Sequence, residues 1–236
     1  FLKNLLEQMP SPMNPVNRIS RLTGYQTRSS TLQLTSHRLA VHSDYEKKIK
    51  LIKTLNLPQS FFVYGTLRDD DDSGAPWTSK WCSNLSHACN AKVYGFKMYK
   101  SKKMNYPFAL KTNNPNDIII GRMVTFNDKN TFCDKLLEAD KIEDYDDTVP
   151  EDEENEYVRD IVDVHIMDNN ETIRNEFYGT NTSPKAIIYY QKDGSCPLTE
   201  CDEIPNGDWM DRYLLISPTF GDLATRMKTT IVRSQL

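Results

Sequence analysis

The most informative stretch of this sequence reads Phe62-Val63-Tyr64-Gly65-Thr66-Leu67-Arg68. An apolar run of strand length, which starts at Phe61, ends here at a glycine and gives way to polar residues. A glycine at the end of a strand lets the backbone turn and expose successive N–H groups, which can bind a carboxylate or an oxyanion. The stretch therefore predicts a strand over residues 61–65 and an anion-binding turn directly after it.

Short strands, with few helices between them, are predicted along the rest of the chain. Apolar and alternating patterns predict strands over residues 93–99, 108–112, 118–126, 157–167 and 186–190, and helices over residues 44–56, 129–139 and 219–233. Gly121, inside one predicted strand, is typical of a bulge or of a close approach between backbones. This mixture favours an α+β fold around a small curved or closed sheet rather than a doubly wound one.

Charge divides the chain into two parts. The net charge of the 236 residues is -4, yet residues 1–60 hold nine basic and only three acidic residues. We interpret residues 1–60 as a basic extension made of an arm and the helix over residues 44–56. The remainder is acidic, with 20 basic and 30 acidic residues, which argues against nucleic-acid binding except through the basic arm.

Several other classes of protein are excluded by the absence of their motifs. No apolar run approaches the ~20 residues of a membrane span, and neither G-x-S-x-G nor G-x-x-x-x-G-K-[ST] occurs. The five cysteines form no C-x-x-C pair, which favours reduced thiols in a reducing intracellular compartment. Residues 16–42 are rich in Arg, Ser and Thr and contain no acidic residue; this leaves a mitochondrial and a cytoplasmic location both open.

A set of further motifs follows the Tyr-Gly-Thr-Leu stretch in order. They read Asn105-Tyr106-Pro107-Phe108-Ala109-Leu110, Leu136-Leu137-Glu138-Ala139-Asp140-Lys141-Ile142-Glu143, Tyr157-Val158-Arg159, Ala186-Ile187-Ile188-Tyr189-Tyr190 and Gly207-Asp208-Trp209. This ordered set resembles the γ-glutamylcyclotransferase-like family, which includes the plant avirulence-induced proteins. The resemblance covers residues 61–213 and leaves residues 214–236 as a C-terminal helical tail. It implies a small mixed β-barrel with flanking helices and one pocket at the barrel mouth.

The resemblance also implies the site and its chemistry. In active relatives, the glutamate of a Leu-Asp-x-x-Glu motif is the general acid/base, and Glu143 stands at this position here. The amides of Gly65–Leu67 would hold the γ-glutamyl group, Tyr64 and Tyr106 would line the pocket, and no metal or cofactor is implied. One carboxylate of raised pKa can take the proton of the attacking α-amine and return it to the departing amine, which closes 5-oxoproline.

Two departures from the family pattern keep the function open. Asp69–Asp72 directly follow the turn, and four adjacent carboxylates would repel an anionic substrate unless they face solvent. The acid-rich loop over residues 145–156 is long, and Glu143 can be interpreted as one more solvated acid. Arg159 is interpreted as an ion-pair partner. The first hypothesis is an enzyme acting on a small γ-glutamyl amine or peptide. The alternative is an inactive accessory subunit of a larger assembly, mitochondrial or not, anchored by the basic arm and binding its protein partner through residues 1–60 and 214–236.

Overall fold

The computed structural model describes residues 43–103, 106–147, 155–168, 183–192 and 197–215. The chain divides into two units, Phe1–Leu55 and Asn56–Leu236. In the first unit, residues 43–54 form a helix, close to the one predicted over residues 44–56. The predicted arm before it and the helix predicted over residues 219–233 lie outside the described residues.

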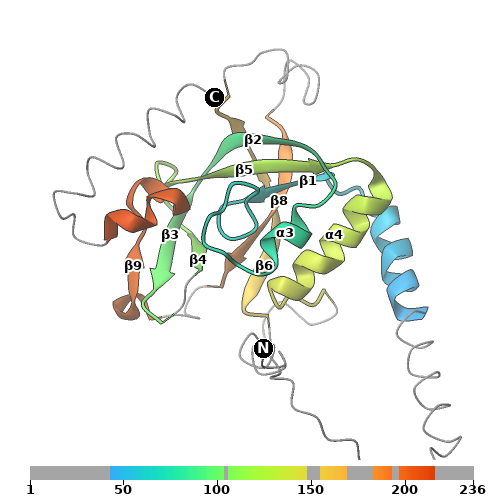
Figure 1. Cartoon of the computed structure of the whole chain (residues 1–236), viewed down its shortest axis with the longest axis horizontal. Coiled ribbons are helices and arrows are strands. Elements are labelled where there is room, and N and C mark those ends of the chain that lie inside the picture. The colour runs from blue at the N-terminus through green and yellow to red at the C-terminus, as the bar shows by residue number, and fades with distance from the viewer. Residues whose placement is uncertain (1–42, 104–105, 148–154, 169–182, 193–196, 216–236) are drawn as a thin grey trace, which may run out of the picture. The chain divides into compact units, whose positions relative to one another are not determined.

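The described residues of the second unit form two sheets (Figure 1). The larger sheet has the strand order β6-β8-β1-β5-β2-β7, and the smaller has the order β4-β3-β9. The strands are β1 (Ser60–Val63), β2 (Leu85–Tyr94), β3 (Phe96–Ser101), β4 (Pro107–Lys111), β5 (Ile118–Phe126), β6 (Tyr157–Asp163), β7 (His165–Ile166), β8 (Lys185–Gln191) and β9 (Cys201–Glu203). The helices are α3 (Thr78–Trp81) and α4 (Lys129–Ile142), with 3-10 turns at Leu198–Glu200, Pro205–Gly207 and Trp209–Leu215. None of these described helices is long and apolar enough to cross a membrane.

The predicted α+β class is confirmed, but the expected barrel does not close. The strands are divided between two ladders, and β6 and β7 remain at opposite edges of the larger one. At Gly95, whose φ is 79°, the chain leaves β2 and enters β3 of the smaller sheet. The strand predicted over residues 93–99 is therefore two strands. The strand predicted over residues 157–167 is likewise divided, into β6 and β7.

The directions of the strands bring several strand termini to the same end of the larger sheet. β1 pairs antiparallel with β5 and parallel with β8, where Phe61 lies opposite Ile187. Because β1 and β8 run in the same direction, their C-terminal residues lie at the same end of the sheet. β6 runs antiparallel to β8 with Tyr157 opposite Gln191, so the first residue of β6 lies at this end of the sheet too. The turn after β1 therefore lies near the end of β8 and the start of β6.

One apolar core is shared by the two sheets. Phe62 of β1, Met98 of β3, Met123 of β5, Ile188 of β8 and Trp209 are all buried in it. Residues from both sheets therefore contribute to this core. Close packing also explains the glycine inside β5, because a Cβ at residue 121 would lie 2.4 Å from a backbone oxygen of β1. The close approach predicted there is confirmed.

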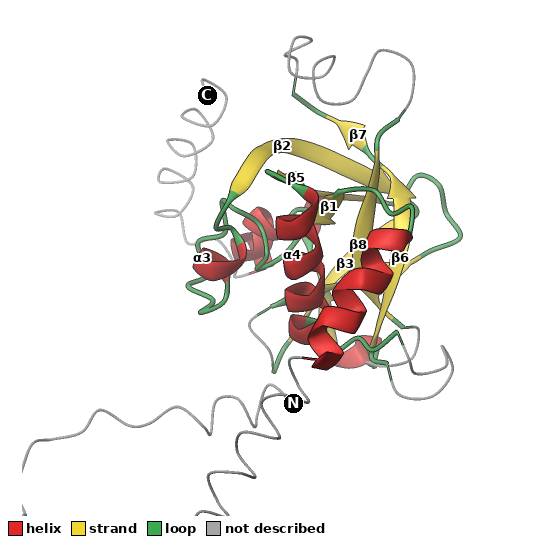
Figure 2. Cartoon of the chain, turned by 90° about the vertical axis from the view of Figure 1, so that its right-hand side faces the viewer, coloured by secondary structure: helices red, strands yellow, loops and turns green. Residues whose placement is uncertain are grey.

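The opposite face of the larger sheet is covered by α3 and α4 (Figure 2). Phe61 of β1 packs against Trp81 of α3 and Phe132 of α4, with ring centroids 5.2 and 5.4 Å apart. Asp128 is the N-cap of α4, and its Oδ1 accepts the N–H groups of Asn130 and Thr131. Each large apolar side chain buried in this way contributes about 1.5–3 kcal/mol.

The helix α4 is one turn longer than the sequence predicts. The predicted buried face of Phe132, Leu136 and Ala139 is confirmed, because all three are at most 2% exposed. The residues after Ala139 follow a polar pattern that does not indicate a further helical turn. Tertiary contacts described below hold this last turn. Its extension to Ile142 places Glu143 as the residue that caps the helix at its C-terminal end.

Candidate active site

The backbone turns immediately after β1, at residues 64–68. The carbonyl oxygen of Gly65 accepts the N–H of Arg68 at 3.0 Å, which closes the turn. A Cβ at Gly65 would lie 2.6 Å from Cγ of Pro107. Glycine is required here by this close approach, because the positive φ values of the described glycines occur at other positions. The expected turn is present, and packing explains its glycine.

Side chains of residues that follow the turn contact its carbonyl oxygens and the Thr66 hydroxyl. The hydroxyl of Thr78 donates to the carbonyl oxygen of Thr66 at 2.5 Å, and Nε1 of Trp77 donates to the Thr66 hydroxyl at 3.0 Å. The thiol of Cys82 lies 3.7 Å from the carbonyl oxygen of Leu67. In contrast, the N–H groups of Thr66 and Leu67 have no acceptor among the described residues. Such amides are able to bind an anionic or carbonyl oxygen.

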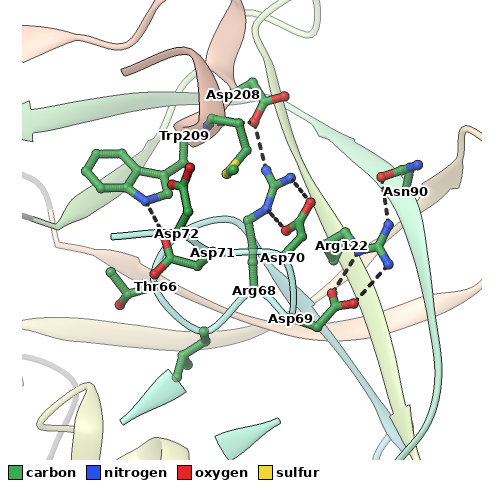
Figure 3. Close-up of polar contacts among 12 residues, drawn as sticks. Thr66, Arg68, Asp69, Asp70, Asp71, Asp72, Asn90, Arg122, Asp208 and Trp209 are labelled. Carbon is green, nitrogen blue, oxygen red and sulfur yellow. Dashed lines mark hydrogen bonds and ion pairs between the residues drawn. The ribbon is translucent and has the colours of Figure 1, made fainter. Parts of the chain in front are cut away.

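The four carboxylates of Asp69–Asp72 all have partners, and Figure 3 shows those of Asp69, Asp70 and Asp71. Their partners, in chain order, are Arg122, Arg68, Nε1 of Trp209 and Arg212. Arg68 is only 3% exposed and also donates to Asp208 at 2.7 Å. Arginines, two of them from distant segments, thus offset part of the negative charge that was expected to repel an anion. Sequence could not show this, since most of these partners lie more than fifty residues away.

Glu143 lies among tyrosine hydroxyls at the end of α4. Burial raises the pKa of Glu143 to about 8, and the negative charge of Glu156 adds to the rise. Burial is also the main cause of the raised pKa of Tyr64, Tyr106 and Tyr157, and the charge of Glu143 contributes at all three. Because these electrostatic effects weaken with distance, the Glu143 carboxyl is near each of these side chains.

The tyrosine–proline segment adjoins the turn after β1. The hydroxyl of Tyr64 accepts the N–H of Ala109 at 3.2 Å, and Gly65 contacts Pro107 as described above. Tyr106 is half-buried beside them. The structure thus brings Tyr64, Gly65, Tyr106 and the Glu143 carboxyl into one region, and the roles predicted for them stay predictions. Asn105, at the start of this motif, lies outside the described residues.

The last turn of α4 is fixed to the sheet by a polar cluster around Asp140. Nη1 of Arg159 donates to both carboxylate oxygens of Asp140 at 2.7 Å, and the hydroxyl of Tyr189 donates to Oδ1 at 2.6 Å. The N–H of Tyr145 donates to the carbonyl oxygen of Asp140 at 2.8 Å. The interpretation of Arg159 as an ion-pair partner is confirmed. This cluster orients the backbone on both sides of Glu143.

Two residues of this region, Gln191 and Glu156, were not singled out by the sequence. Nε2 of Gln191 donates to Oε1 of Glu156 at 3.0 Å, and Tyr157 lies opposite Gln191 in the ladder. Glu156 closes an acid-rich run in which no pattern distinguishes it from its neighbours. The alternation of β8 could have placed Gln191 on the face of Tyr189, but not beside Glu143.

Metal and disulfide chemistry find no support in the part of the chain that the structure describes. No group of three or more His, Cys, Asp or Glu side chains there could hold a metal ion. Cys82, Cys89, Cys133 and Cys201 form no disulfide bond among the described residues.

The fold and the site place a carboxyl group of raised pKa near the turn after β1. The family model described as "Gamma-glutamyl cyclotransferase, AIG2-like" matches residues 61–211. The chain belongs to this family, and the resemblance inferred from the ordered motifs is confirmed. A comparison with curated proteins gives no match.

Solved structures with a similar arrangement come from several organisms. An AIG2-like protein of Mus musculus is 15% identical with a TM-score of 0.41, covering 61% of this chain and 83% of that one. A yeast gamma-glutamyl cyclotransferase specific to glutathione is 14% identical with a TM-score of 0.36, covering 58% and 69%. YkqA of Bacillus subtilis is 15% identical with a TM-score of 0.40; 67% of this chain is covered but only 42% of YkqA. At these values the likeness does not extend to substrate.

Proposed function

We propose that this chain is a γ-glutamyl cyclotransferase that uses Glu143 as its general acid/base. The observation that carries the proposal is the raised pKa of Glu143, about 8. A free glutamate has a pKa of about 4.3 and holds no proton to donate at neutral pH. A carboxyl group that titrates near the working pH can both accept and donate a proton. Membership of the AIG2-like family supports the class of reaction.

The proposed reaction is an intramolecular displacement in a γ-glutamyl amine or peptide. The α-amine nitrogen attacks the γ-carbonyl carbon, and a new C–N bond closes the five-membered ring of 5-oxoproline. The bond between that carbon and the departing nitrogen then breaks. Glu143 accepts a proton from the attacking nitrogen and delivers it to the departing one, so it finishes in its starting state. Positioned proton transfer of this kind contributes about 10²–10⁴-fold to the rate.

The turn after β1 supplies the proposed substrate contacts. The unpaired N–H groups of Thr66 and Leu67 would hold an oxygen of the γ-glutamyl group, and the bonds from Thr78 and Trp77 keep the opposite side of the turn in place. The loss of one such donor typically costs about 10²–10³-fold in turnover. The pairing of Asp69–Asp72 supports this role, because it offsets part of the negative charge that would repel an anionic ligand at the turn.

The test is the release of 5-oxoproline from γ-glutamyl amino acids and γ-glutamyl-lysine-type amines. We expect Glu143→Gln to lower kcat by about 100-fold or more, in line with the loss of general acid–base catalysis. Asp144→Asn is the matched control, because Asp144 is the next carboxylate, is exposed, and has a φ of 51° that asparagine tolerates. Unchanged turnover in Glu143→Gln would refute the mechanism. No product from any substrate would instead favour the accessory-subunit alternative.

A further inference from the structure

The 3-10 turn Trp209–Leu215 is bonded to the segment that directly follows the turn after β1. Nη1 of Arg68 donates to Oδ1 of Asp208, the residue before the 3-10 turn, at 2.7 Å. Nε1 of Trp209 donates to Oδ1 of Asp71 at 2.9 Å, as Figure 3 shows. Both ends of the stretch over residues 68–71 are thus held by the same short part of the chain.

Arg212 extends this contact by one more residue. Its Nη2 donates to Oδ1 of Asp72 and, at 2.6 Å, to the hydroxyl of Tyr213. Its Nη1 donates to the carbonyl oxygen of Trp209 at 3.1 Å. The guanidinium carbon lies 4.6 Å from the ring centroid of Trp209 and 4.3 Å from that of Tyr213. Because Arg212 is also only 5% exposed, its planar side chain is fixed where it meets Asp72.

Backbone hydrogen bonds connect this contact to the turn after β1. The N–H of Asp71 donates to the carbonyl oxygen of Arg68 at 3.3 Å, and the N–H of Arg68 donates to the carbonyl oxygen of Gly65 at 3.0 Å. Two turns therefore follow one another and share Arg68. A shift of residues 71–72 would open the second turn and release the first. The amides proposed to bind the substrate belong to that first turn, so their position depends on where residues 71–72 are held.

We propose that Arg212 is a positioning residue, which keeps the amides of the turn after β1 in place for the γ-glutamyl group by holding Asp72. This role rests on the proposed function, because it assumes that the turn binds the substrate. Arg212 lies just outside residues 61–211, which the family model matches, and Asp72 belongs to the acidic run that departs from the family pattern. The pair thus lies partly outside what the family model describes.

Two variants interrupt this contact from opposite sides. The Asp72 side chain is 55% exposed, and an ion pair with an exposed partner contributes little to global stability. Asp72→Ala therefore removes the contact without disturbing the core. Arg212→Met removes the buried partner and keeps an apolar side chain between its neighbours; circular dichroism checks that this variant folds.

The first measurement is hydrogen–deuterium exchange on the full chain, followed by mass spectrometry of peptides that contain residues 64–72. The N–H groups of Arg68 and Asp71 are hydrogen-bonded within the two turns, so their exchange reports how often these turns open. We expect this exchange to be at least about 5-fold faster in Asp72→Ala and in Arg212→Met, in the range of coupling between residues in contact.

Asp202→Ala is the matched control for these variants. The Asp202 side chain is 47% exposed and pairs with Lys102 at 3.8 Å, but it lies on β9 of the smaller sheet. The change thus removes a comparably exposed carboxylate and its ion pair at another place in the domain. Exchange at residues 64–72 should equal that of the unaltered chain.

The second measurement is the affinity for γ-glutamylalanine and ε-(γ-glutamyl)lysine, by isothermal titration calorimetry on chains that also carry Glu143→Gln. We expect Asp72→Ala to weaken binding about 5- to 10-fold. In chains that retain Glu143, KM should rise by the same factor while kcat stays within about 2-fold, because the turn holds the substrate before and during the reaction. A purely structural role would instead lower the folded fraction, which reduces kcat and leaves KM unchanged.

The outcomes separate the positioning role from the proposed function. Exchange that is unchanged in both Asp72→Ala and Arg212→Met overturns the positioning role, as does faster exchange with unchanged affinity. Binding that weakens in Asp72→Ala, in a chain that releases no 5-oxoproline with Glu143 in place, supports the positioning role and overturns the proposed function. If neither probe binds any of the chains, both proposals are overturned.

Discussion

The raised pKa of Glu143 has a direct consequence for stability that does not depend on any substrate. Its carboxyl group changes from a pKa of 4.5 to about 8 on folding. Between these values the unfolded chain releases this proton while the folded chain keeps it. Because the folded state then binds more protons, the free energy of unfolding falls as pH rises. The stabilising contribution is complete below pH 4.5 and is lost once pH passes about 8.

The size of the effect follows from the shift. Each pKa unit corresponds to about 1.4 kcal/mol, so the part of the shift between pH 5.5 and pH 8.5 is worth about 3.4 kcal/mol as an upper limit. Part of the Glu143 residue is exposed to solvent. Solvent screening therefore lowers the expected contribution to stability to roughly 2–3 kcal/mol. Glu143→Gln cannot titrate. We therefore expect its stability relative to the unaltered chain to rise by that amount across this pH range.

The assay is urea unfolding followed by tryptophan fluorescence at pH 5.5, 7.0 and 8.5 and constant ionic strength. Asp144→Asn serves as the control, and its stability should run parallel to that of the unaltered chain. The reasoning is refuted if the curve of free energy against pH for Glu143→Gln also runs parallel to that of the unaltered chain. In that case the carboxyl group of Glu143 would have an ordinary pKa in the folded state.

Two further variants test the turn after β1. Gly65→Ala sets a Cβ 2.6 Å from Pro107 Cγ; we expect a loss of about 1–3 kcal/mol from overpacking and a raised KM for γ-glutamyl substrates, measured by urea unfolding and steady-state kinetics. Arg68→Met leaves the carboxylates of Asp70 and Asp208 without their buried partner; we expect a loss of about 2–4 kcal/mol, and stability within about 0.5 kcal/mol of the unaltered chain would show that this cluster is not structural.

The elements that are decided locally could be predicted from the sequence. The strand over residues 118–126 coincides with β5, and those over residues 108–112 and 186–190 differ from β4 and β8 by a residue at either end. Their alternating apolar residues face a core on one side, which is the signal that sequence carries best. The order of the motifs was sufficient to identify the family before any contact was known.

The remaining features depend on contacts between distant segments. Gly95 divides the stretch over residues 93–99 into two strands, although both halves face the same core. The acidic residues after the turn pair with Arg122 and Arg212, which are distant from them in the sequence. Gln191 became informative only when the ladder placed it opposite Tyr157. A single sequence contains no record of such pairings.

The most direct test of the central claim is the formation of 5-oxoproline from a γ-glutamyl amine at pH 8, near the pKa of Glu143. The account predicts release of 5-oxoproline and free amine in equal amounts by the unaltered chain and by Asp144→Asn, with a loss of about 100-fold or more in Glu143→Gln. Equal rates in all three proteins would contradict it, as would the absence of product from every γ-glutamyl substrate.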